Sequence, residues 1–177
     1  YDNDNKSYLD FTAGWAVLNI GHSHNAVTKA IKDQASKILQ MSNLYYTTPQ
    51  LSLAEIIVEN SSIDRIFFCN SGAEANEGAC KLARKWGKLN LNGAYEIITA
   101  LNSFHGRTQA MMAATGQPHY QDNWKPLMPG FINVTYYQIK ITILIKICIG
   151  CSIGHRGLLK FPLVSFIFKM QSLFILK

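Results

Sequence analysis

Apolar and polar residues alternate along the chain with two different periods. A helical spacing of three and four residues begins at Asn25, which we expect to be the N-cap, and continues to Leu39. The same spacing predicts three further helices, at about residues 50–60, 73–89 and 107–115. These helices are separated by short loops rich in Gly, Asn and Pro.

Short apolar runs between the helices predict strands. We expect one strand at residues 8–11, where apolar and polar residues alternate, and a last one at 131–136. The runs at 65–69 and 95–100 have the composition of strands that are buried on both faces. Because strands and helices alternate, the fold class is α/β with a largely parallel sheet.

Charge and composition change abruptly near the end of the chain. The first 138 residues carry eleven basic and eleven acidic side chains, whereas residues 139–177 carry six basic and no acidic ones. The neutral part argues against a nucleic-acid-binding or membrane-binding protein, and lysines interrupt every apolar run of the last part before it could span a bilayer. We therefore expect residues 137–177 to be an aberrant basic and apolar tail.

Cysteine and histidine do not predict a metal site. Four cysteines in a chain of 177 residues without a small secreted framework favour reduced thiols in an intracellular protein. Cys148, Cys151 and His155 resemble half of a zinc site, but no second pair accompanies them. We expect no bound metal and no disulfide.

A first motif lies where the run at 65–69 is followed by a helix. Ser71, Gly72 and Ala73 come at the start of that helix, where unpaired N–H groups and the helix dipole favour a phosphate. The residue types alone also fit an ordinary turn in which Ser71 only caps the helix. The motif therefore predicts a phosphate site only in combination with a second motif.

A second motif follows the run at 95–100, so that its loop is expected at the same edge of the sheet. Phe104 can stack on a planar cofactor, and Arg107 can bind a carboxylate with its planar fork of donors. An arginine at this place can equally be a solvated surface residue.

Taken together, the motifs resemble class III pyridoxal-phosphate-dependent aminotransferases. The resemblance covers about residues 1–136 and rests on these segments in order: residues 10–14, 21–22, 42–46, 68–77 and 104–108. It implies a fold-type-I transferase, with residues 1–48 forming the N-terminal segment of the small domain and active-site loop, and residues 49–136 the first part of the cofactor-binding large domain.

The resemblance also implies roles for single residues. Ser71, Gly72 and Ala73 would hold the phosphate of pyridoxal 5'-phosphate (PLP), and Phe104 and His105 would contact the cofactor. Arg107 would bind the α-carboxylate of the substrate. Ornithine aminotransferases usually have Trp at the place of His105, so this residue favours the acetylornithine subgroup.

The implied activity is a transamination of arginine biosynthesis by a homodimer. The distal amino group of N-acetylornithine would pass through PLP to 2-oxoglutarate. The expected compartment is the mitochondrial matrix or plastid stroma in a eukaryote and the cytoplasm in a bacterium. Two alternatives remain open: an ornithine or other class III omega-aminotransferase, and an inert fragment that contacts PLP or dimerises.

The family's Schiff-base lysine and the aspartate that pairs with the pyridine nitrogen would lie beyond Tyr136. No lysine of the last 41 residues has the family's context for that role. We therefore expect the chain to be truncated, to be inactive by itself, and not to fold as a stable monomer.

Overall fold

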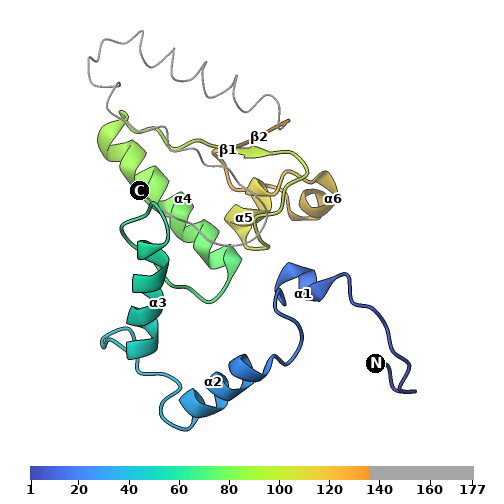
Figure 1. The fold of residues 1–177 in the computed structure, drawn as a ribbon. Helices are drawn as coiled ribbons and strands as arrows, with labels where there is room; N and C mark the ends of the chain where they lie inside the picture. The colour runs from blue at the N-terminus through green and yellow to red at the C-terminus, as the bar shows by residue number, and fades with distance from the viewer. Residues whose placement is uncertain (136–177) are drawn as a thin grey trace. The chain divides into compact units, whose positions relative to one another are not determined.

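The computed structural model describes residues 1–135, and the chain divides into two compact units between Leu53 and Ala54. Helices and strands are labelled in Figure 1. The first unit contains α1 (Ala13–Ala16), α2 (Asn25–Ala35) and the start of α3 (Thr48–Glu59). The second contains the rest of α3 and all later elements, which are α4 (Gly72–Asn90), β1 (Ile97–Ala100), α5 (Gln109–Ala114), α6 (Pro118–Gln121), the 3-10 helix η1 (Asp122–Trp124) and β2 (Phe131–Val134).

Side chains of the first unit are strongly exposed. Among residues 1–53 no side chain with a described environment is buried, and large apolar residues such as Leu9, Phe11 and Leu44 are more than 80% exposed. An apolar surface of this kind does not provide the free energy of folding that a buried core does.

The predicted strand at residues 8–11 is wrong, because the segment has no strand partner among residues 1–135 and turns instead. Asp10 Oδ1 accepts hydrogen bonds from the N–H groups of Thr12 and Ala13 at 2.8 and 2.9 Å. A short carboxylate that binds the following amides stabilises a turn in place of a ladder.

Helix α2 begins at Asn25, and its N-cap is His24 and not Asn25 as predicted. His24 has an extended backbone, and its Nδ1 accepts a hydrogen bond from the Ala26 N–H at 3.3 Å. The helix ends at Ala35, four residues before the predicted end, where Ser36 Oγ donates to the Asp33 carbonyl at 2.9 Å. Serine competes with helix continuation in this way.

The second unit has the predicted α/β architecture with a parallel sheet. Strands β1 and β2 pair in parallel, with Ile97 opposite Phe131 and Ala100 opposite Val134. The connection between them contains α5, α6 and η1, and Figure 1 shows α5 beside α4 and below the two strands. Helices α6 and η1 were not expected from the sequence.

The predicted strand at residues 65–69 is wrong within the described part of the chain. Residues 66–69 form no strand there, and Phe67 and Phe68 are 73% and 37% exposed. An apolar run becomes a strand only where a neighbouring strand pairs with its N–H and C=O groups. Arg65 alone forms an isolated β-bridge, and residues 1–135 provide no such neighbour for residues 66–69.

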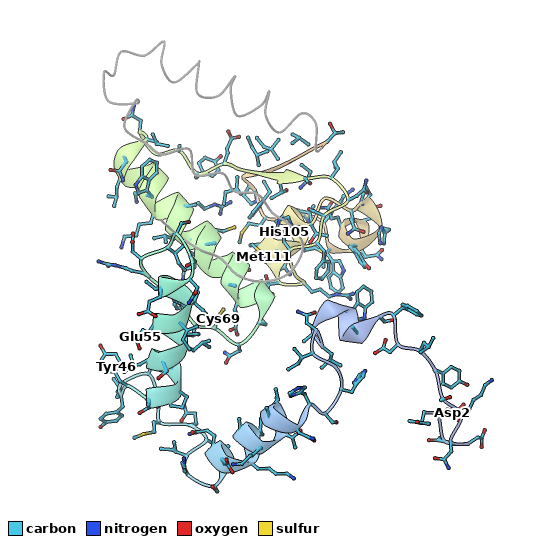
Figure 2. The ribbon with its side chains drawn as sticks, viewed as in Figure 1. Asp2, Tyr46, Glu55, Cys69, His105 and Met111 are labelled. Carbon is cyan, nitrogen blue, oxygen red and sulfur yellow. The ribbon has the colours of Figure 1, made fainter. Side chains whose placement is uncertain are left out.

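A small core joins the helices of the second unit to the sheet. Ala110, Met111 and Ala114 of α5 are buried against Cys80 of α4 and Phe131 of β2. Burial raises the pKa of the Cys80 thiol to about 11, because the thiolate would lose its hydration. Met111, which Figure 2 labels, is fully buried and lies near the centre of this unit.

Arg84 ties the far end of α4 to the beginning of both strands. Its Nε donates to the Tyr95 carbonyl at 3.1 Å and its Nη2 to the Pro129 carbonyl at 2.9 Å. The guanidinium carbon lies 5.0 Å from the centre of the Phe131 ring, a distance typical of cation–π contacts. The residues of α4 that contact the later part of the unit, from residue 94 onward, follow a spacing of three and four: Ala73, Asn76, Glu77, Cys80, Arg84 and Gly87.

Candidate functional site

The N-terminus of α4 has the geometry of an anion site. Ser71 is an extended N-cap whose Oγ accepts a hydrogen bond from the Glu74 N–H at 3.2 Å, and Glu74 in turn accepts from the Asn70 N–H at 2.7 Å. This arrangement is a variant of the capping box, in which Glu74 binds the N–H of the residue before the N-cap and not that of the N-cap itself. It leaves the N–H groups of Gly72 and Ala73 without an acceptor among residues 1–135, at the positive end of a 19-residue helix.

The loop at residues 102–108 lies directly against this helix start. Gly106 has a φ of 130°, and a Cβ built on it would lie 2.7 Å from Ala73 Cβ and 3.1 Å from Ala73 Cα. Only glycine lets the two backbones approach so closely. The two segments that carry the predicted site residues are therefore brought together at one place.

Two side chains of α4 bind the same loop. Asn76 Nδ2 donates to the His105 carbonyl at 2.6 Å, and the Glu77 carboxylate accepts a hydrogen bond from the Thr108 hydroxyl. Sequence reasoning assigned no role to Asn76, Glu77 or Thr108. The polar residues at helical spacing after Gly72 were the available signal, but their partners are about 30 residues away in the sequence.

The structure buries His105 beneath the loop, where 5% of it is exposed. Its Nδ1 lies 3.2 Å from Ser103 Oγ, and its N–H donates to Thr115 Oγ1 at 3.1 Å. Burial lowers the pKa of His105, and the Ala114 carbonyl opposes this effect in part. His105, which Figure 2 labels, is therefore part of a buried network that supports the loop.

Phe104 and Arg107, in contrast, are exposed on the loop. About half of Phe104 is exposed, and its ring contacts Tyr120 edge to face with ring centres 6.4 Å apart. The guanidinium carbon of Arg107 lies 6.0 Å from the Phe104 ring centre and 5.3 Å from that of Tyr120. Within residues 1–135 no carboxylate forms an ion pair with Arg107.

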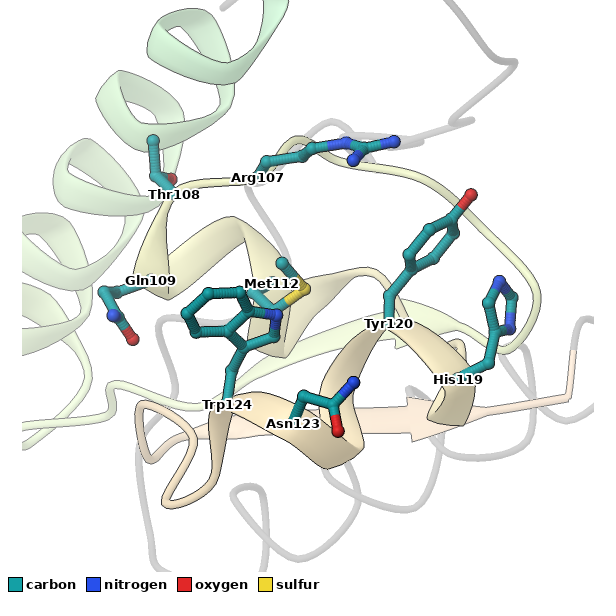
Figure 3. Close-up of a pocket in the computed structure, with 8 residues that line it drawn as sticks. All are labelled: Arg107, Thr108, Gln109, Met112, His119, Tyr120, Asn123 and Trp124. Carbon is teal, nitrogen blue, oxygen red and sulfur yellow. The ribbon is translucent and has the colours of Figure 1, made fainter.

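Arg107 lies at the edge of an open cavity of about 460 Å³. Figure 3 shows Arg107 extending from the loop toward Tyr120, with Trp124 and Met112 also lining the cavity. The complete lining is Arg107, Thr108, Gln109, Met112, His119, Tyr120, Asn123 and Trp124. A cavity that combines one cationic group with aromatic and amide side chains suits a small ligand with a carboxylate.

Sequence reasoning missed the aromatic part of this cavity. Tyr120 and Trp124 lie on α6 and η1, which were not predicted. Pro118 at the first position of α6 is a helix-start signal that the sequence did contain.

Residues 1–135 offer no metal centre and no membrane span. No group of three or more His, Cys, Asp or Glu side chains is clustered there as metal ligands would be. No helix of this part of the chain is both long enough and apolar enough to cross a membrane. Cys148, Cys151 and His155 lie outside the described residues.

Solved structures that share the fold define its class, which is the α/β fold of aminotransferases. The ornithine aminotransferase of Toxoplasma gondii superposes with a TM-score of 0.72 and is 29% identical, and the match covers 77% of this chain and 33% of that one. A Bacillus anthracis aminotransferase is 33% identical with a TM-score of 0.70, over 76% and 30% of the two chains.

Sequence comparison gives the family. Residues 1–146 match the family described as Aminotransferase class-III, and the chain belongs to it. Over 141 residues it is 54% identical to the acetylornithine aminotransferase of Methanocaldococcus jannaschii, and over 136 residues it is 52% identical to that of Gloeobacter violaceus. These alignments cover 79% and 76% of this chain but 35% and 34% of the relatives. The chain thus spans about a third of the length of the curated relatives it matches.

Proposed function

We propose that these residues form the cofactor-phosphate and substrate-carboxylate sites of a PLP-dependent acetylornithine transaminase. The observation that carries the proposal is the contact of Gly106 with Ala73, which brings the loop of Phe104 and Arg107 to the helix start at Ser71. Relatives at 54% and 52% identity are acetylornithine aminotransferases, and a Bifidobacterium kashiwanohense neighbour, a taurine:2-oxoglutarate aminotransferase, was crystallised with PLP and glutamate.

The residues present fit the phosphate group of PLP. The N–H groups of Gly72 and Ala73, which have no acceptor in the described part of the chain, and the positive end of the α4 dipole favour a dianion, and Ser71 adds a hydroxyl at the same place. Glu74 is held by the Asn70 N–H, so its carboxylate does not occupy these amides. Bound PLP would supply the electron sink that amino-group transfer requires.

Phe104 and Arg107 would divide the remaining recognition between them. The half-exposed Phe104 ring offers an apolar face for the cofactor ring, as the family resemblance implies. Arg107 would bind the α-carboxylate of N-acetylornithine and thereby orient its distal amine toward the cofactor. His105 would support the loop of Phe104 and Arg107 from its buried side, because its ring lies in the buried network with Ser103.

The substrate assignment rests on the named relatives. As the amino donor, N-acetylornithine is favoured over ornithine, because the acetylornithine relatives are 54% and 52% identical, whereas the ornithine aminotransferase is 29% identical. The proposed amino acceptor is 2-oxoglutarate. We also propose a homodimer for the complete protein. The exposed apolar side chains of residues 1–53 support it, because such a surface needs a cover.

The test uses a chimera, in which residues 1–135 of this chain replace the aligned segment of the Methanocaldococcus jannaschii acetylornithine aminotransferase. The substrate pair is N-acetylornithine and N-acetylputrescine, which lacks only the α-carboxylate. Arg107→Ala should raise the activation free energy for N-acetylornithine by about 2 to 5 kcal/mol and leave N-acetylputrescine unaffected. A chimera that transaminates other amines but not N-acetylornithine would refute the substrate, and equal losses on both amines would refute the role of Arg107.

A further inference from the structure

Two side chains of α4 bind residues on both sides of Arg107, one through a backbone carbonyl and one through a side-chain hydroxyl, and the contacts proposed for cofactor and substrate use neither of them. Asn76 binds the carbonyl of His105, two residues before Arg107, at 2.6 Å. Glu77 binds the hydroxyl of Thr108, the residue directly after it. Asn76 and Glu77 are both partly buried.

The two side chains share one face of α4 with Ala73, because residues three and four apart lie side by side on a helix. Ala73 contacts Gly106, so three points of this face contact three residues that surround Arg107 in the sequence. The Arg107 loop is thus fixed to the same helix whose first turn forms the anion site.

Arg107 itself depends on this support. Its side chain is exposed and has no carboxylate partner within residues 1–135. The ring of Tyr120, 5.3 Å from the guanidinium carbon, contacts the end of the side chain and does not hold the backbone of Arg107. A long arginine side chain selects a carboxylate only when its Cα is held in place, since small displacements of a recognition group cost large factors in rate.

We propose that Asn76 and Glu77 are positioning residues that set the place of Arg107 for recognition of the substrate carboxylate. This inference rests on the proposed function of Arg107. It differs from a purely structural role, because loss of the two hydrogen bonds should affect carboxylate-bearing substrates selectively.

The experiment compares Asn76→Leu and Thr108→Val, which remove the hydrogen bonds at nearly constant volume, in the chimera. Their kcat/KM for N-acetylornithine should fall about 10-fold to 100-fold, whereas kcat/KM for N-acetylputrescine should change less than about threefold. Thr108→Ser retains the hydroxyl that binds Glu77 and should restore most of the loss. Equal losses on both amines, or a Thr108→Ser variant as impaired as Thr108→Val, would overturn the inference.

A second measurement does not depend on activity. Amide hydrogen exchange of residues 103–109 in the cofactor-free chimera should become at least about 10-fold faster in Asn76→Leu and Thr108→Val, with exchange in residues 78–88 of α4 unchanged. If the parent chimera does not accept N-acetylornithine, the proposed function fails and this measurement decides the positioning role alone. Unchanged exchange of the loop would then overturn it.

Discussion

Gly106→Ala is the most direct perturbation of the place where the two site segments meet. The new Cβ would lie 2.7 Å from Ala73 Cβ, 3.1 Å from Ala73 Cα and 3.2 Å from Met111 Cβ, whereas ordinary contact begins at 3.4 Å. Neither neighbour can swing away, because one is a methyl group and backbone of α4 and the other begins a fully buried side chain.

The expected cost has two parts. Crowding in a packed region typically costs about 1 to 3 kcal/mol, and holding an alanine at a φ of 130° adds about 1 to 3 kcal/mol. Gly93→Ala is the matched control, since Gly93 has a φ of 87° and nothing lies within 4 Å of its added Cβ. It should show the backbone part only.

Urea unfolding of the chimera measures both parts. Gly106→Ala should lower the free energy of unfolding by about 2 to 6 kcal/mol, and Ala73→Gly in the same protein should recover about 1 kcal/mol of the crowding part, because it removes the opposing methyl group while the contacts with the residue 73 Cα and Met111 Cβ remain. PLP should also dissociate faster, because the Ala73 N–H moves with its backbone. A Gly106→Ala variant that is no less stable than Gly93→Ala would show that the two segments are not in contact.

Three further predictions concern the phosphate site, pH and the isolated chain. Gly72→Asp in the chimera should weaken PLP binding at least about 10-fold in a titration, whereas the uncharged Gly72→Asn should weaken it much less. An acidic residue in the first helical turn stabilises a helix, so weaker binding by Gly72→Asp would not reflect loss of α4. Equal binding by the two variants would contradict the phosphate assignment. Because burial lowers the pKa of His105 below the unfolded value of 6.5, the unfolded state binds more protons below that pH, and stability should decrease as the pH falls below about 6.5. His105→Gln should reduce this slope in urea unfolding from pH 5 to 8, and an identical slope would refute it. The 177-residue chain expressed alone should show neither turnover nor a cooperative melt with PLP, since residues 1–53 bury no described side chain; a sharp two-state melt would contradict this.

Local signals were enough to predict much of the second unit. The capping serine at residue 71 and the apolar stripe after it gave α4 to within one residue at each end, and Gly116 correctly ended the helix that became α5. The sequence also predicted that the two loops meet, but for a reason that the structure does not support, since residues 66–69 form no strand and the contact is made by Gly106 against Ala73.

Contacts between distant residues could not be predicted in the same way. The run at 65–69 looks like a strand, but pairing depends on a neighbour that composition does not reveal. Likewise, the sequence showed only that Asn76 and Glu77 are polar residues of a helix. Their partners, His105 and Thr108, are separated from them by a loop, a strand and a second loop.

The contact stripe of α4 makes the helix a fixed spacer, with consequences for which changes of length the fold tolerates. Glu77 and Arg84 are seven residues apart, about two helical turns, so they face the same side while binding the Arg107 loop and the beginnings of both strands. Insertion of a single residue between them would rotate Arg84 by about 100° and move it by about 1.5 Å along the axis. One of the two attachments would then be lost. Insertions and deletions should therefore be excluded from residues 78–83. A change by a whole helical turn would return Glu77 and Arg84 to the same side of α4, but it would still displace the strands relative to the loop.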